Sequence, residues 1–195
     1  MIASTFSPGS TQIKWRTFER RSMLPLESEY LWRIKTGAVR TLTSSEDGIN
    51  IGLGLWGPGD VVGRALSKAD PYQIECLTSV QVSLVPLTRY QEVNEAIIQH
   101  IQQFQEFLEI MHCRSVDSSL MRLLLWMAKR FGRTSEKGQT IELRLTHQEI
   151  AEFLGATRVT ITRLLNDFEK RGIIQRLPHQ YIVLHDQHPF WHYEI

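Results

Sequence analysis

The first half of the chain contains short stretches in which hydrophobic and polar positions alternate, separated by turn residues. Between residues 29 and 87 this pattern predicts a series of short β-strands. The clearest alternation covers residues 49–55 and follows Asp47-Gly48, a dipeptide typical of a tight hairpin turn. The other expected strands are residues 15–18, 30–34, 38–42, 73–77 and 80–85. Short strands at such close spacing are typical of a sandwich or a closed roll.

The hydrophobic period then changes to that of a helix, from about residue 88 to residue 114. Its apolar residues follow one another at alternating steps of four and three, which is the spacing of a heptad seam. These residues are Ile97, Ile101, Phe104, Leu108 and Met111. Such a helix could lie against its own β-roll, but the narrow seam between polar flanks favours pairing with a second copy. We therefore expect a homodimer formed through this helix.

The last third of the chain predicts two short helices joined at a glycine. A helix is expected over residues 118–131 and a short strand over residues 140–145. Thr146 and Glu149 then have the spacing of a capping box, which starts a helix that Gly155 interrupts. Thr157 begins a second helix, which Gly172 ends. This arrangement is typical of a helix-turn-helix.

The second of these helices has an apolar face and a polar face. The apolar face combines Leu164, Leu165 and Phe168 with either Val159 or Ile161. The polar face consists of Thr157, Arg158, Thr160, Thr162, Arg163 and Asn166. It holds no acidic residue between positions 158 and 166, whereas a merely solvated face usually mixes both charges. Because arginine can bond guanine O6 and N7 together, and threonine suits thymine or phosphate, the sequence predicts a helix that reads DNA.

The charge distribution and the following residues favour the same interpretation. Residues 114–180 carry twelve basic and seven acidic side chains, although the formal net charge of the whole chain is only +1. Residues 173–176 and 180–184 predict two strands around a turn at residues 177–179, which would form the wing of a winged helix. Together with this wing, Thr146, Thr157, Thr160 and Arg176 are expected to hold the DNA backbone.

Other classes of protein fit the sequence less well. Two cysteines are too few for a disulfide scaffold or a four-thiolate metal site. All seven histidines lie at residue 100 or later, outside the β-rich half, which argues against a jelly-roll metalloenzyme of the cupin kind. Gly52-x-Gly54 lies on a strand instead of opening a helix, so a dinucleotide site is not expected either. We expect no enzymatic activity, no bound metal and no cofactor.

The ends of the chain and its longest apolar run bear on location. Residues 123–128 are too few to span a bilayer, and residues 1–10 lack the order of a signal peptide. A cytoplasmic protein with no membrane partner is therefore expected. His185, His188 and His192 could form a metal cluster, but a C-terminal segment folded back on the wing or on a partner is the simpler interpretation.

Residues 145–165 (LTHQEIAEFLGATRVTITRLL) resemble the helix-turn-helix of the cyclic-AMP receptor/FNR family of bacterial transcription regulators. Residues 157–163 are most similar to the cyanobacterial global nitrogen regulators of that family. Residues 35–39 and 59–63 resemble the two glycine turns of the family's effector-binding roll, and the resemblance covers about residues 17–184.

The resemblance implies an α+β fold in three parts. An N-terminal double-stranded β-helix, a jelly roll like the cyclic-nucleotide-binding domain, would cover residues 1–87. A long dimerisation helix would cover residues 88–116, and a C-terminal winged helix-turn-helix would cover residues 117–195.

The resemblance also implies a homodimer that regulates transcription at a palindromic operator, whose half-sites lie one DNA turn, about 34 Å, apart. Arg158 and Arg163 fall where the family contacts base edges. Val159 falls where many relatives have an acidic base-reading residue, so the preferred half-site should differ from that of the cyclic-AMP receptor. RNA polymerase as a partner, and activation as the outcome, are implied by the family alone.

Two departures from the family concern the effector. Arg64 stands where nucleotide-binding relatives have a glutamate for the ribose, and residues 68–71 lack the Arg-Ser pair that holds the phosphate. A cyclic nucleotide would bury unpaired polar groups here, so it is not expected. Arg64 and Lys68 could instead bind an organic acid, as the nitrogen regulators bind 2-oxoglutarate.

Two further alternatives remain open from the sequence. Iron–sulfur relatives need a cluster of N-terminal cysteines, but none precedes Cys76, and a small buried thiol is expected there in preference to a haem ligand. The alternative to a regulator is a jelly-roll small-molecule-binding or interaction module whose helix-turn-helix is vestigial.

Overall fold

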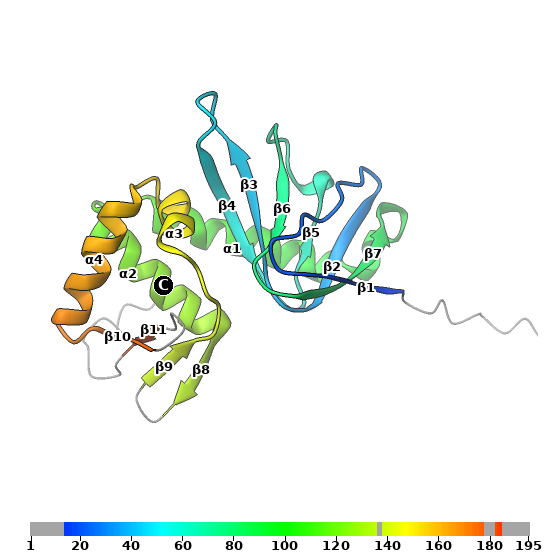
Figure 1. Cartoon of the computed structure of the whole chain (residues 1–195). Helices are drawn as coiled ribbons and strands as arrows, with labels where there is room; N and C mark the ends of the chain where they lie inside the picture. Colours follow the sequence, from blue (N-terminus) through cyan, green and yellow to red (C-terminus); the bar gives the residue numbers. More distant parts are fainter. Residues whose placement is uncertain (1–13, 136–137, 178–181, 185–195) are drawn as a thin grey trace, which may run out of the picture.

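The N-terminal half of the protein is a β-roll, which two long helices connect to a C-terminal helix-turn-helix unit (Figure 1). The computed structural model describes residues 14–135, 138–177 and 182–184. The strands of the roll are β1 (Trp15–Phe18), β2 (Tyr30–Thr36), β3 (Val39–Ser44), β4 (Asn50–Trp56), β5 (Val61–Val62), β6 (Gln73–Cys76) and β7 (Val80–Pro86). A short 3-10 helix, η1 (Arg64–Leu66), follows β5.

The strands of the roll form two antiparallel sheets around one core. One sheet has the order β1-β7-β2-β5, and the other has the order β4-β3-β6. Buried side chains from both sheets form a common cluster, whose members include Trp32, Val39, Trp56, Val62, Ile74, Cys76 and Val82. Cys76 is fully buried within it, which agrees with the small apolar thiol expected from the sequence. The expected jelly-roll-like fold is confirmed.

The six strands expected in the roll are all present, with boundaries that shift by at most two residues. Strand β5 was not expected, because two residues are too few to show an alternating pattern. Val61 and Val62 nevertheless pair with Trp32 and Arg33 and are fully buried, so the close packing of the roll decides their conformation.

The helix expected from residue 88 begins later, and that part of the prediction was wrong. Residues Leu87–Glu92 form a 3-10 helix, η2, and the α-helix α1 covers Asn94–Met111. Val93 separates the two with non-helical backbone angles, φ −132° and ψ 9°, and is 2% exposed. It packs in a cluster with Leu31, Val61 and Val85, so the chain bends where burying this valine against the roll is favourable.

The second long helix, α2, covers Val116–Phe131 and begins at a side-chain cap. The Ser118 backbone N–H donates to Ser115 Oγ at 3.2 Å, which starts the helix two residues before the predicted position. The strand expected over residues 140–145 is shorter and lies earlier in the chain. Strand β9 (Gly138–Ile141) pairs with the unpredicted β8 (Gly132–Ser135).

The C-terminal unit consists of α3 (His147–Leu154), α4 (Arg158–Lys170), β10 (Ile174–Arg176) and β11 (Ile182–Leu184). Strands β10 and β11 pair antiparallel in a sheet of order β10-β11-β9-β8, as expected for a wing. Residues 178 and 179 of the predicted turn and the first two residues of the predicted strand 180–184 lie outside the described residues, as does the tail with His185, His188 and His192.

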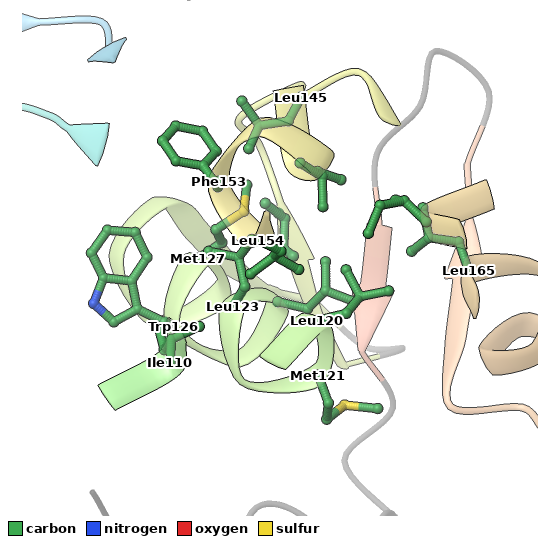
Figure 2. Packing of buried hydrophobic residues seen from close by; sticks show 14 of the residues in the cluster. Ile110, Leu120, Met121, Leu123, Trp126, Met127, Leu145, Phe153, Leu154 and Leu165 are labelled. Atoms are coloured by element: carbon green, nitrogen blue, oxygen red, sulfur yellow. The ribbon is translucent and has the colours of Figure 1, made fainter. Parts of the chain in front are cut away.

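A second hydrophobic core joins α2 to the helix-turn-helix (Figure 2). Leu120, Leu123, Leu124 and Met127 of α2 lie at its centre, with α3 and α4 packed around them. Phe153 of α3 and Ile110 of α1 belong to the same cluster, so this core extends from the helix-turn-helix to α1 (Figure 2).

Asp60 connects the roll to both long helices through a buried carboxylate. Its Oδ2 accepts hydrogen bonds from the Gly57 backbone N–H at 2.7 Å and from Arg130 of α2 at 2.6 Å. Its Oδ1 accepts from Gln103 Nε2 of α1 at 2.9 Å. Removing one partner of a buried ion pair of this kind typically costs about 3–5 kcal/mol, because the other charge is left unpaired.

His100 forms a second contact between α1 and the roll. Its ring stacks on Trp56 with a centroid distance of 3.7 Å and an interplanar angle of 3°, and its Nδ1 lies 3.0 Å from the Val61 carbonyl oxygen. Burial lowers the pKa of His100 below its ordinary value, although the Val61 carbonyl and Asp60 act in the opposite direction. The neutral imidazole is therefore the form that fits this contact.

No helix of the described residues is long and apolar enough to cross a membrane. In the same part of the chain, no three His, Cys, Asp or Glu side chains come together as a potential metal site. Cys113, like Cys76, is a free cysteine.

The depressed pKa of His100 predicts that acid destabilises the fold through this residue. The unfolded chain binds a proton near the ordinary pKa of about 6.5, whereas the folded chain resists it until lower pH. The stabilisation is therefore complete above about pH 6.5 and is lost as the pH falls toward the folded pKa. Denaturant unfolding measures the free energy of unfolding at each pH. As the pH falls, this free energy should decrease less in His100→Gln than in the wild type. His147, whose pKa is also lowered, is unchanged in both proteins, so equal pH dependence would contradict the role given to His100.

Candidate nucleic-acid interface

Helix α3 begins at a complete capping box. The Glu149 backbone N–H donates to Thr146 Oγ1 at 3.2 Å, and the Thr146 backbone N–H donates to Glu149 Oε2 at 2.6 Å. These two bonds satisfy N–H groups that a helix start otherwise leaves without a partner. Thr146 thus has a defined structural role in addition to the DNA-backbone contact predicted for it.

The turn between α3 and α4 depends on Gly155 and Thr157. Gly155 ends α3 in the left-handed conformation, with φ 58° and ψ 32°, which a residue with a side chain rarely adopts. Thr157 then caps α4, because its Oγ1 accepts the Thr160 backbone N–H at 3.1 Å. Both positions follow directly from the residue types at the predicted turn.

Helix α4 buries one face and exposes the face expected to read DNA. The buried residues are Ile161, Leu164, Leu165 and Phe168, which settles the choice that the sequence left open between Val159 and Ile161. Val159 is 77% exposed, and Arg158 and Arg163 are exposed on the same helix. Neither arginine forms an ion pair with any described residue, so both guanidinium groups are available to a ligand.

The hydroxyl of Thr162 takes part in two hydrogen bonds within the protein. It donates to the Arg158 carbonyl at 2.9 Å and lies 2.8 Å from His147 Nδ1 of α3. Since the hydroxyl proton goes to the carbonyl, the imidazole must donate to the hydroxyl oxygen. Burial, followed by the charges of Arg176 and Arg158, lowers the pKa of His147. This geometry favours a role for Thr162 in holding α4 against α3.

Arg176 in β10 also has partners within the protein. Its guanidinium donates to Glu169 Oε2 at 2.5 Å and to Asn166 Oδ1 at 2.7 Å, both on α4. Hydrogen bonding to Arg176 lowers the pKa of Glu169, so the pair carries opposite charges. Arg176 therefore holds β10 against α4, and Glu169 partly neutralises its positive charge.

The predicted dimer helix has an exposed apolar stripe, which differs from the predicted seam at three positions. Ile101, Phe104 and Leu108 are exposed as expected. Ile97 packs instead against the roll, and Met111 packs against the second core. Ile98 is exposed and joins the stripe, although the heptad spacing did not select it.

The two residues proposed for an effector lie in the segment after β5. Arg64 begins η1 and donates to the Ala69 carbonyl, while Lys68 is exposed. Next to them, burial raises the pKa of the Tyr72 hydroxyl, with Arg64 acting in the opposite direction. A recess between β4 and α1, beside Trp56 and Phe104, is too small to hold a water molecule. A cavity of about 450 Å³ lies elsewhere, where the end of α1 meets α2 and α4.

The capping box at Thr146 should contribute measurably to stability. Thr146→Ala removes the side-chain acceptor for the Glu149 N–H and should lower the free energy of unfolding by about 1 kcal/mol. Denaturant titration followed by circular dichroism measures this change. Thr146→Ser keeps the hydroxyl and is the matched control, so an equal loss in both variants would show that the cap is not the cause.

The chain is similar to known proteins both in sequence and in fold. Residues 119–188 match the Crp-like helix-turn-helix domain. The regulatory protein CysR of Synechococcus elongatus is 44% identical over 167 residues, which are 84% of this chain and 81% of that protein. The global nitrogen regulator of the same organism is 32% identical over an alignment of 188 positions that covers 85% of this chain and 83% of that protein.

The fold is similar to that of solved regulators. A CRP-family transcriptional regulator from Thermus thermophilus superposes with a TM-score of 0.75 at 24% identity, covering 88% of this chain and 92% of that one. At this identity the likeness concerns the fold alone, which is the order of β-roll, connecting helices and helix-turn-helix that Figure 1 shows. The resemblance expected from residues 145–165 is confirmed.

Proposed function

This chain belongs to the CRP/FNR family of DNA-binding transcription regulators, and we propose that it acts as a homodimer on a two-fold symmetric operator. The observation that supports this proposal best is the outward face of α4. That face presents Arg158, Val159 and Arg163, with no acidic residue between positions 158 and 166. Arg158 and Val159 lie in the first turn of α4, the helix end whose dipole favours phosphate.

The roles within the interface follow from the chemistry of each side chain. Arg158 and Arg163 form no ion pair within the described part of the chain, and each guanidinium can bond two acceptors of one guanine. Val159 offers only an apolar surface, which suits a thymine methyl and cannot accept a hydrogen bond from cytosine. Two further groups of side chains complete the interface. Thr146, Thr157 and Thr160 lie at the two helix starts, where a hydroxyl can donate to a phosphate, and Thr162 and Arg176 hold α4 in place.

The homodimer would form through the stripe of Ile98, Ile101, Phe104 and Leu108 on α1. These four apolar side chains lie exposed on one helix in a single chain, although burying each would be favourable by about 1.5–3 kcal/mol. Pairing with the same stripe of a second copy covers them and relates the two recognition helices by a two-fold axis.

An effector in the β-roll is part of the proposal, with Arg64 and Lys68 as the groups that would meet an organic acid. Contact with RNA polymerase, leading to activation, is the second family property that we extend to this chain. Support for communication between the roll and the helix-turn-helix comes from the packed helices that join them.

Replacing Arg163 with alanine should reduce operator affinity by about 1–3 kcal/mol and relax the preference at one base pair. The loss arises because a bidentate contact to one base disappears while the phosphate contacts remain. Selection of duplexes from a random pool, followed by binding titrations on each base change, measures both effects. Arg171→Ala, just past the far end of the same helix and paired with Asp167, is the control and should leave base preference unchanged. Uniform weakening on all sequences would identify Arg163 as a phosphate contact.

Replacing Phe104 with glutamate should convert the dimer to a monomer and abolish operator binding. A carboxylate buried in an apolar seam has no partner there, and the two copies would bring two such charges together. Sedimentation equilibrium gives the mass, and a gel-shift titration gives the affinity. Gln99→Glu adds the same charge at an exposed position outside the stripe and should remain dimeric. An unchanged mass for Phe104→Glu would refute this interface.

A further inference from the structure

The helix-turn-helix is docked on the β-roll through a buried ionic contact. Arg40 of β3 is 7% exposed at its side chain and lies between two carboxylates. Its Nε donates to Glu75 of β6 at 2.7 Å, within the roll. Its NH1 donates to Glu152 of α3 at 2.6 Å, and the Glu152 side chain is only 9% exposed. One guanidinium group therefore links the β4-β3-β6 sheet of the roll to the first helix of the DNA-binding unit.

Arg40 and Glu152 remain paired only while α3 stays docked on the roll. Burial alone would lower the pKa of Arg40, but hydrogen bonds from Glu75 and Glu152 and the charges of Glu75 and Glu149 outweigh it, so the net pKa is raised. The second oxygen of Glu152 accepts from Gln148 Nε2 at 3.2 Å, which fixes the carboxylate on its own helix. Separating α3 from the roll would leave the Glu152 carboxylate without its cationic partner and would leave Arg40 with Glu75 alone, which is costly.

Phe153, which follows Glu152 in α3, adds an apolar contact between α3 and the roll. Its ring is fully buried and rests on the backbone of β4 at Gly52, where an added Cβ would lie 2.1 Å from Phe153 Cδ1. The ring also meets Phe107 of α1 at a centroid distance of 5.5 Å and an angle of 82°. Figure 2 shows Phe153 on the side of α3 that faces Trp126 and the roll strands. The ion pair and the aromatic contact together fix α3 against the roll in more than one direction.

The position of α3 also determines the position of α4. The two helices share the second hydrophobic core, and the bond between His147 and Thr162 adds a polar contact between them. Because these contacts make the helix-turn-helix one rigid piece, the joint at Arg40 orients the recognition helix relative to the roll. In a dimer paired through α1, it also orients each recognition helix relative to its partner.

We propose that Arg40 and Glu152 are positioning residues that set the distance between the two recognition helices and thereby select the spacing of the operator half-sites. This inference rests on the proposed function, since it requires a dimer that reads two half-sites. A rigidly docked pair of recognition units matches one spacing. It also loses less conformational freedom on binding, because the two units are already oriented. A loosened pair can adapt to several spacings, but it binds the preferred one less tightly.

Duplexes with two identical half-sites and central spacers from two base pairs shorter to two base pairs longer than the preferred length test this inference. The wild type should prefer one spacing by about tenfold or more, because each added base pair rotates and shifts the second half-site. Glu152→Gln should reduce this preference to about threefold or less, mainly by weakening binding to the preferred duplex. Gly52→Ala should have the same effect by a different route, since its Cβ displaces the Phe153 ring.

The matched control is Glu75→Gln, which removes a carboxylate from the same guanidinium but leaves the contact between the roll and α3. It should keep the spacing preference of the wild type. Binding to a duplex with a single half-site should be equal in all four proteins, since the recognition helix itself is unchanged.

Two outcomes would overturn the inference. One is that Glu152→Gln and Gly52→Ala keep the wild-type spacing preference. The other is that they lose single-half-site binding to the same extent as binding to the full operator. The failure of the proposed function is distinguishable from both, because then the wild type itself would bind none of the duplexes.

Discussion

The carboxylate of Asp60 lies 2% exposed at the point where the roll, α1 and α2 meet, and the arrangement of the chain depends on it. It holds the turn after β4 through Gly57, the long helix through Gln103 and the second helix through Arg130. A buried charge needs partners from every side, so it specifies one arrangement of these three segments more strictly than apolar packing does. The helices that carry the DNA-binding unit thus leave the roll in a defined direction.

Rigid placement of the recognition helix follows from contacts on both sides of the helix-turn-helix. Thr162 and Arg176 hold α4 to α3 and to the wing, while Arg40 and Phe153 dock α3 on the roll. The polar residues of this region therefore divide into two groups. Some satisfy the protein's own hydrogen bonds, and the remaining exposed ones are available for DNA.

Local sequence signals predicted the helix ends and the turn of the candidate interface, because these features depend on neighbours in the chain. The capping box at Thr146, the left-handed turn at Gly155 and the cap at Thr157 all require only residues within one helical turn. The exposure of Arg158 and Arg163 followed from helical period once these ends were fixed. Roles that depend on distant partners were not visible, and so Thr162 and Arg176 were predicted only as DNA contacts.

The sequence by itself determined the class of each segment: alternating strands in the first half, an amphipathic helix, and a helix-turn-helix with a basic outward face. Only the tertiary structure decided that Ile98 lies exposed while Ile97 packs on the roll, and that α1 begins after the buried Val93. It also brought Arg40 and Glu152 together across 112 positions of sequence. The physical reason is that periodicity reports which side of an element is apolar, whereas the partner of that side, or of a buried charge, is set by segments far away in the chain.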